Sequence, residues 1–177
     1  VLVDGVNVKD YAFDTLYDKL GYVTQKAVLF SGSIRDNVFF GESRATQEAD
    51  DLNAAIELSQ AQEFVSKLPD GTEHRIAQMG RNVSGGQKQR LSIARALARK
   101  PEILIFDDSF SALDYRTDAK LREGLSKQLR DTTKIIVAQR ISTIRHADKI
   151  VVLDRGEAVG MGTHEELMKN CAVYREI

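Results

Sequence analysis

Two short stretches of this sequence combine residue types that suit phosphate and metal chemistry. The run from Ser84 to Gln87 reads Ser-Gly-Gly-Gln and opens a helix-like segment. A Gly pair before a helix offers backbone N–H groups and the positive end of the helix dipole to an anion. Asp107 and Asp108 follow a short apolar run, and carboxylates at the carboxyl end of a buried strand can hold Mg²⁺ beside a phosphate. Together the two stretches predict a site for a nucleoside triphosphate.

Each stretch has a plainer interpretation when it is taken alone. The pair Gly85-Gly86 suits a turn before a capped helix, because Ser84 and Gln87 form a capping-box pattern. The Asp pair suits a solvated turn after a strand. Only one helix and one strand separate the two stretches, and this spacing favours a joint site.

The usual phosphate loop, Gly-x-x-x-x-Gly-Lys-[Ser/Thr], does not occur in these 177 residues. Its lysine and its cradle of amides supply the main electrostatic anchor for a triphosphate. We therefore expect these residues alone to bind ATP weakly and not to hydrolyse it. The sequence opens on the apolar run Val1-Leu2-Val3, from which we expect it to begin inside a larger protein.

The composition narrows the class of protein. The sequence is 42% apolar and 29% charged, as in an ordinary globular domain. Its net charge is -1, and because nucleic-acid binders usually carry a basic surplus, we expect no nucleic-acid partner. No apolar run approaches the roughly 18 residues of a membrane span. Cys171 is the single cysteine, which fits a reducing cytosol and a role as a small apolar packing residue.

Apolar periodicity and turn signals predict an α/β protein. The strongest expected helix is 86–99, with Leu91, Ala94 and Leu97 at helical spacing. From residue 102 strands and helices alternate, and the strands lack a period of two, so we expect a parallel sheet covered on both faces. The expected helices are 14–20, 33–40, 46–59, 61–68, 86–99, 117–130, 141–146 and one after Thr163. The expected strands are 1–3, 21–24, 103–106, 134–138 and 149–153, with a turn leading to 158–161 and a loop at 72–83.

This order of elements predicts an α/β core interrupted by a helical insertion. Residues 1–32 would form part of the ATP-binding core. Residues 33–100 would form a helical subdomain that ends with the helix after the Gly pair. Residues 101–177 would form the remainder of the core.

Motifs in a fixed order along essentially the whole sequence resemble the nucleotide-binding domain of an ABC (ATP-binding-cassette) transporter of the exporter type. Gln25 resembles the Q-loop glutamine, and Leu29–Val38 resembles the stretch that follows it in exporters. Ser84 to Gln87 resembles the ABC signature. The remaining matches are 103–107 with the Walker B strand, 111–114 with the D-loop, and Gln139 with the position of the switch histidine.

The resemblance implies a P-loop NTPase-like core of parallel sheet and helices, with the part that carries Walker A missing upstream of Val1. It also implies a head-to-tail pair of such domains that enclose two ATP molecules with Mg²⁺. Gln25 and Asp107 would serve the Mg²⁺ of the chain's own site, whereas the signature would contact ATP held mainly by the partner. The implied nucleotide-binding set is Gln25, Ser84, Gly85, Gly86, Gln87, Asp107 and Asp114.

The resemblance further implies a transmembrane domain upstream in the same polypeptide. Gln25 would sense the γ-phosphate and pass the nucleotide state to that domain through the helical insertion. Ala77 and Gln78 stand where exporters usually carry a Gly-Glu pair in a loop near the membrane domains. The implied location is the cytoplasmic face of the cell membrane.

Two departures fall on the catalytic positions that the resemblance implies. The family usually has Glu after the Walker B Asp, and here Asp108 is one methylene shorter; a displacement near 1 Å can cost about 10²-fold in rate. Gln139 replaces the switch histidine, and an amide cannot titrate near neutral pH. Together the two changes predict that the chain's own site hydrolyses ATP poorly. The intact signature would complete a competent site on a different partner, as in heterodimeric exporters.

Two other functions are compatible with the motifs. A chromosome-maintenance or DNA-repair ATPase head also has a signature and a Walker B strand, but the exporter-like run Leu29–Val38 and the lack of basic surplus argue against it. A non-catalytic dimerisation cassette is favoured by Asp108 and Gln139. His74, His146 and His164 show no metal-ligand spacing, and Tyr22 is expected to be a packing residue.

Overall fold

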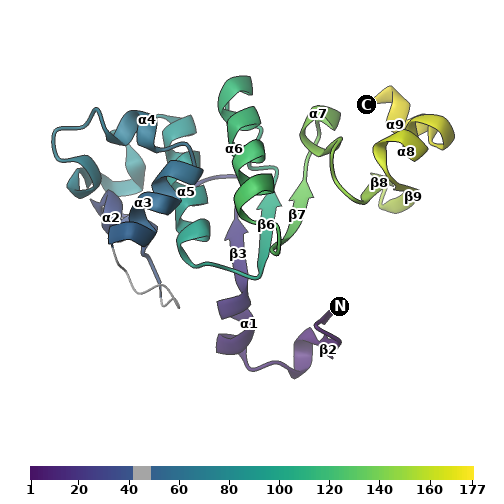
Figure 1. Cartoon of the computed structure of the whole chain (residues 1–177), viewed down its shortest axis with the longest axis horizontal. Coiled ribbons are helices and arrows are strands. Elements are labelled where there is room, and N and C mark those ends of the chain that lie inside the picture. Colours follow the sequence, from purple (N-terminus) through teal and green to yellow (C-terminus); the bar gives the residue numbers. More distant parts are fainter. Residues whose placement is uncertain (42–48) are drawn as a thin grey trace. The chain divides into compact units, whose positions relative to one another are not determined.

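The computed structural model describes residues 1–41 and 49–177. It has two compact units, Val1–Ile135 and Ile136–Ile177, which are described separately here. Figure 1 shows the elements along the chain. The first unit opens with the short antiparallel pair β1 (Leu2–Val3) and β2 (Val6–Asn7), the 3₁₀ helix η1 (Val8–Asp10) and α1 (Phe13–Lys19).

The sheet that carries the acidic pair has the strand order β3-β6-β7. Its strands are β3 (Leu20–Val23), β6 (Ile103–Asp107) and β7 (Thr133–Val137). β3 and β6 are parallel, with Leu20 opposite Ile103 and Val23 opposite Phe106. The prediction of a parallel sheet is confirmed for this pair of strands. The helix that follows β6 is α6 (Tyr115–Gln128).

Gly21 allows β3 to pack tightly against its neighbours. A Cβ atom at this position would lie 2.8 Å from both Leu104 Cδ2 and Pro101 Cγ, and 3.0 Å from the carbonyl oxygen of Ala96. The carbonyl belongs to the backbone of a buried helix and cannot rotate away. Even one added methyl group would therefore force the helix and the strand apart.

We expect Gly21→Ala to lower the free energy of unfolding by about 1–3 kcal/mol, as for other overpacked cores. Urea unfolding of the domain, followed by circular dichroism, measures this change. Gly85→Ala is the matched control, because a Cβ at Gly85 meets nothing within 4 Å. Equal unfolding midpoints for the two variants would contradict the packing argument.

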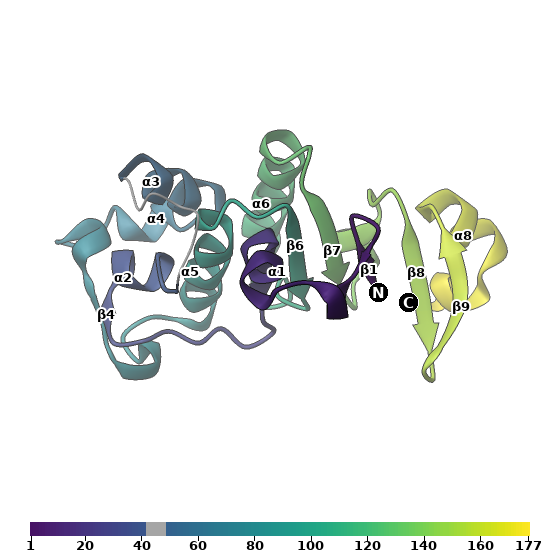
Figure 2. The same ribbon diagram turned by 90° about the horizontal axis from the view of Figure 1, so that it is seen from below.

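Several shorter helices lie around the helix that begins at the Gly pair. This helix is α5 (Gly85–Ala98), and α2 (Ile34–Val38), α3 (Ala49–Leu58) and α4 (Gln62–Val65) are grouped around it (Figure 2). Leu91, Ile93 and Ala94 of α5 are fully buried. The structure confirms the predicted helix 86–99, whereas α4 is shorter than the expected 61–68. Residues 46–48 of the expected helix 46–59 lie outside the described residues.

The segment 72–83 is not the plain loop that the sequence predicts. It contains the strand β5 (Arg75–Ile76), which pairs antiparallel with β4 (Gly32–Ser33), and 3₁₀ helices at Gly71–Glu73 and Gln78–Gly80. A strand of two residues is too short to show alternation. Its partner also lies far away in the sequence, so no local pattern reveals it.

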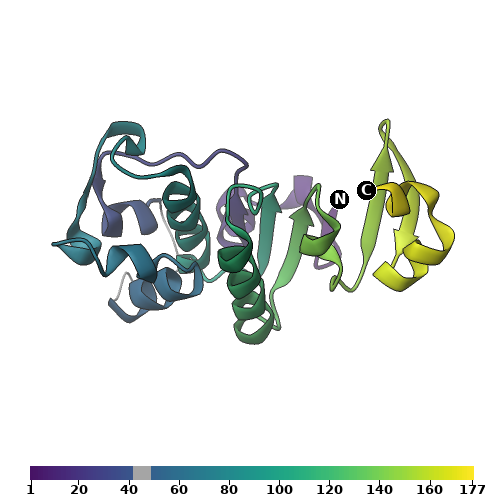
Figure 3. The same ribbon diagram turned by 90° about the horizontal axis from the view of Figure 1, so that it is seen from above.

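The second unit is a β-hairpin with helices on one face (Figure 3). Its elements are α7 (Ile141–Ile144), β8 (Ile150–Asp154), β9 (Glu157–Gly162), α8 (His164–Asn170) and α9 (Ala172–Glu176). Ile150, Val152, Leu167, Cys171 and Tyr174 form its core.

The other face of the hairpin is exposed, whereas the sequence predicts that the strands are covered on both faces. Val151 and Leu153 of β8 are 49% and 69% exposed, and β8 pairs antiparallel with β9. Within this unit the helices supply only one covering layer. None of the helices in the described residues has the length and apolar character needed to cross a bilayer.

Candidate nucleotide-binding site

The acidic pair lies at the carboxyl end of β6, as predicted. Asp107 is the last residue of the strand. The hydroxyl group of Tyr22, on the neighbouring strand β3, donates a hydrogen bond to Asp107 Oδ2 at 2.9 Å. This bond to the carboxylate raises the pKa of Tyr22. Tyr22 is 54% exposed and is not the packing residue expected from the sequence. Its place on the strand that pairs with β6 is the signal that the sequence analysis missed.

Gln25 contacts the second aspartate. Gln25 Nε2 donates to Asp108 Oδ2 at 3.1 Å, and Ser111 Oγ donates to the carbonyl oxygen of Asp108 at 2.7 Å. Asp108 has φ +43°, a left-handed conformation that Asp tolerates better than most residues. The structure thus brings Gln25 to the acidic pair through a hydrogen bond to Asp108.

The start of α5 is a capping box built by Ser84 and Gln87. The Ser84 N–H donates to Gln87 Oε1 at 2.8 Å, and the Gln87 N–H donates to Ser84 Oγ at 3.3 Å. Gly85 and Gly86 form the first turn of the helix, where backbone N–H groups have no intrahelical acceptor. A Cβ at Gly85 would meet nothing within 4 Å, and one at Gly86 would lie 3.5 Å from the carbonyl oxygen of Ala112. The space in front of Gly85 is therefore open to a ligand.

Asp114 has a structural role inside the chain. It is the N-cap of α6, and its carboxylate accepts hydrogen bonds from the Thr117 N–H at 2.9 Å and from Thr117 Oγ1 at 2.7 Å. The side-chain bond to Thr117, followed by the backbone bond, lowers the pKa of Asp114. Contact of Asp114 with a nucleotide stays a prediction.

The cap at Asp114 predicts a pH dependence. Because its pKa is lowered in the folded state, its stabilising contribution is complete above the unfolded pKa of about 3.9. The contribution is lost as the pH falls through the folded pKa. Asp114→Asn keeps an acceptor for the cap but does not titrate. We expect its melting temperature to fall less steeply than that of the wild type below about pH 4. Parallel melting curves in a pH series would contradict this.

Gln139 belongs to the second compact unit, Ile136–Ile177. It follows β7 and precedes α7. The role of Gln139 at the switch position stays a prediction.

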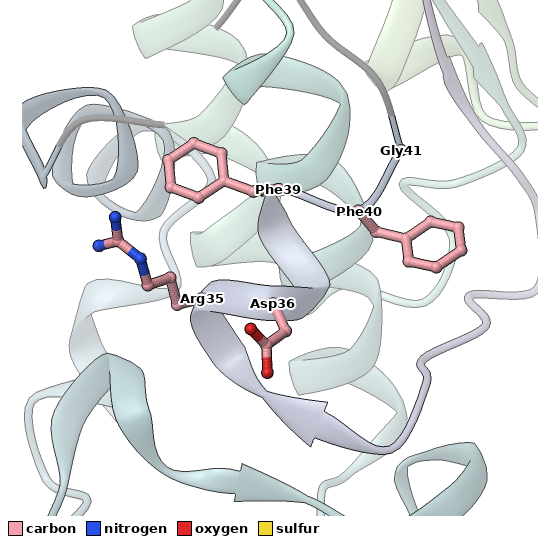
Figure 4. A pocket seen from close by; sticks show the side chains of 5 residues that line it. All are labelled: Arg35, Asp36, Phe39, Phe40 and Gly41. Carbon is pink, nitrogen blue, oxygen red and sulfur yellow. The ribbon is translucent and has the colours of Figure 1, made fainter. Parts of the chain in front are cut away.

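A separate pocket of about 280 Å³ lies beside α2 (Figure 4). It is lined by Arg35, Asp36, Phe39, Phe40 and Gly41. None of the predicted site residues lines it. Asp36 itself is engaged in the cap of α2, where it accepts from the Ser33 N–H at 2.7 Å, so we assign this pocket no part in nucleotide binding.

The site offers few protein ligands to a metal ion. Within residues 1–41 and 49–177 no group of three or more His, Cys, Asp and Glu side chains could hold one. Asp107 and Gln25 nevertheless provide the carboxylate and amide oxygens that Mg²⁺ prefers. In triphosphate sites Mg²⁺ takes one or two protein carboxylates and fills its other positions with phosphate and water. This residue set therefore fits an ion held mainly by its nucleotide.

Comparison with known proteins identifies the family. The sequence pattern of the ABC transporter family matches residues 1–111, more than half of the chain. The chain belongs to the ABC transporter family. The fold is the α/β core of an ABC ATPase.

Individual ABC proteins resemble the chain along its whole length. An uncharacterised ABC transporter ATP-binding protein of Mycobacterium tuberculosis is 45% identical over 179 residues, which cover 99% of this chain. A Bacillus subtilis protein whose name describes a multidrug export ATP-binding/permease protein is 41% identical over 177 residues. The structure of a bacterial Atm1-family ABC exporter with ATP bound matches 99% of the chain with a TM-score of 0.92 and 35% identity.

The chain spans about 30% of the length of each of these proteins. The relatives therefore contain much more than an ABC ATPase domain.

Proposed function

We propose that this chain is the ATP-binding domain of an ABC exporter, which couples ATP binding and hydrolysis to transport across a membrane. The observation that carries the proposal is the capped start of α5 with open space in front of Gly85. A terminal phosphate placed there would meet the first-turn N–H groups and the positive end of the helix dipole.

The proposal divides the nucleotide contacts between two domains. Ser84, Gly85, Gly86 and Gln87 contact ATP that a second ABC domain holds. Gln25 and Asp107 serve the nucleotide of the chain's own site, with Asp114 in the D-loop nearby in sequence. When Mg²⁺ is bound it neutralises phosphate charge, and Asp107 and Gln25 supply the protein oxygens for it. Support comes from the 3.1 Å hydrogen bond from Gln25 to Asp108, the residue that follows β6.

The chain's own site is proposed to hydrolyse ATP poorly. Asp108 is one methylene shorter than the Glu usual in the family, and Gln139 lacks the titratable ring of the switch histidine. The signature keeps both glycines, so it completes a competent site on a second, different ABC domain. The resulting exporter is a heterodimer with Asp108 and Gln139 on its impaired side.

A membrane domain is proposed to lie in the same polypeptide. The name of the Bacillus subtilis relative, which describes an ATP-binding/permease protein, supports this arrangement, because the chain covers only 30% of that protein. The ATP-binding domain then lies at the cytoplasmic face of the cell membrane.

Photolabelling tests the proposed contacts. The intact transporter is incubated with Mg²⁺ and an ATP analogue that carries an azide on the γ-phosphate, irradiated, and mapped by mass spectrometry. We expect labelling of the peptide that contains Ser84 to Gln87 in the assembled transporter. We expect none in residues 1–177 alone, which lack a phosphate loop and bind ATP weakly. Labelling that avoids this peptide in the assembled transporter would contradict the proposal.

A second candidate function is a non-catalytic dimerisation cassette. The residues that favour it are Asp108 and Gln139, which stand at both catalytic positions. The two functions differ in how ATP turnover responds to a change in the signature. An exporter hydrolyses ATP at the partner's site and loses that turnover when the signature of this chain is altered, whereas a pure dimerisation cassette keeps it.

A further inference from the structure

Helix α5 holds the backbone that carries Gln25. Gln89, in the second turn of α5, is 1% exposed, and its Nε2 donates to the carbonyl oxygen of Thr24 at 3.2 Å. Because a carbonyl oxygen only accepts, the nitrogen of the Gln89 amide must face it. The residue immediately before Gln25 is thereby joined to the helix that begins at the signature.

The same segment is also held on the other side of Gln25. Arg95 of α5 donates from Nη1 to the carbonyl oxygen of Val28 at 3.0 Å and from Nε to the carbonyl oxygen of Asn37 at 2.7 Å. The buried side chain of Asn37 accepts from the Phe30 N–H at 2.8 Å and donates to the Phe30 carbonyl at 2.9 Å. Residues 24–30 are therefore anchored to α5 and α2, with Gln25 between the anchors.

The side chain of Gln25 donates from Nε2 to Asp108 Oδ2 at 3.1 Å. A continuous path thus runs from the signature along α5 to Gln89, then through Thr24 and Gln25 to the acidic pair. Gln89 lies five residues after Ser84, about 7.5 Å along a stiff helix. All of these residues belong to the unit Val1–Ile135.

We propose that Gln89 is a positioning residue that couples the signature helix to the Gln25–Asp108 pair. Through this bond the nucleotide state at the chain's own site changes the position of the signature that serves the partner's site. The inference rests on the proposed function and adds the side chain through which the two sites communicate within one chain.

The contact is suited to coupling more than to holding the fold together. Thr24 is an exposed residue, so we expect water to replace the donor to its carbonyl group when Gln89 is changed. Apolar side chains such as Leu91 and Ile93, both fully buried, hold α5 in place. Loss of the Gln89 amide should therefore spare stability and weaken only the link between α5 and Gln25.

The test compares Gln89→Met, Gln25→Ala and the double variant in the intact purified transporter. Methionine has a similar length but no donor. The readouts are phosphate release as a function of ATP concentration, and thermal unfolding. We expect Gln89→Met to lower kcat about tenfold, less than the roughly 10²-fold cost of a 1 Å misplacement, because Gln89 acts on the site only through Gln25. The melting temperature and the half-saturating ATP concentration should be nearly unchanged. The double variant should turn over no more slowly than Gln25→Ala alone, because the two residues act in series.

Ser92→Ala is the control, since Ser92 is another buried polar residue of α5, 6% exposed, and should keep full turnover. The inference is overturned if Gln89→Met or Gln25→Ala keeps full turnover, if the two losses multiply in the double variant, or if Ser92→Ala reproduces the loss. A wild-type transporter with no ATP turnover would instead contradict the proposed function.

Discussion

Replacing Gly85 with Asp should abolish ATP turnover by the intact transporter and leave the domain as stable as before. A Cβ atom added at Gly85 would meet nothing within 4 Å in this chain. An acidic residue in the first turn of a helix interacts favourably with the helix dipole. The same carboxylate would face the terminal phosphate in the proposed site. Two unit charges 4 Å apart repel by about 4 kcal/mol at an effective dielectric constant of 20, which corresponds to about 10³-fold in binding of the phosphate.

Phosphate release measures the expected loss of ATP turnover, and thermal unfolding measures the stability that we expect to stay unchanged. Gly85→Ser is the matched control, because it adds a small uncharged side chain at the same place and should retain much more activity. Gly21→Ala provides the opposite pattern, lower stability through a packed core remote from the signature in sequence. Full activity of Gly85→Asp would show that no phosphate approaches the start of α5.

Restoring both catalytic positions should raise turnover. In the intact transporter, Asp108→Glu combined with Gln139→His would return the longer carboxylate and the titratable ring to the chain's own site. We expect about a tenfold gain in ATP turnover at that site, which is below the 10²–10⁴-fold range of general acid–base contributions because the two restored side chains would fit imperfectly. Each single change should give less, because both residues act on one reaction.

The gain should come with a cost in stability. Asp108 has φ +43°, and Glu adopts left-handed backbone less readily than Asp does. We therefore expect the restored variant to be slightly less stable. Asp107→Asn in the restored background is the control and should remove the gain, since Asp107 is the proposed oxygen ligand for Mg²⁺. Unchanged turnover in the restored variant would contradict the proposal of an impaired site.

Local features of the site could be predicted from the sequence. The capping box of Ser84 and Gln87 depends on residues three positions apart, and the structure confirms it. The place of Asp107 at the end of β6 follows from the apolar run before it and is also confirmed. Both features are decided by near neighbours in the chain, so a single sequence is enough to find them.

Contacts between distant segments could not be predicted in the same way. Tyr22 reaches Asp107 across 85 positions, and Gln89 reaches Thr24 across 65. The sequence shows both side chains but not the register that brings them to their partners. The exposed face of β8 was missed for a related reason, because an apolar strand does not reveal whether one or two layers cover it.

The position of Cys171 has a practical consequence for spectroscopy. Its thiol is enclosed in the core of the second unit, 5% exposed, and a Cβ at Gly160 would lie only 2.9 Å from its sulfur. A buried thiol in apolar surroundings reacts poorly with alkylating reagents. Within these 177 residues, a maleimide dye or spin label should therefore attach only to cysteines introduced on the surface, and the native cysteine need not be removed before distances between probes are measured.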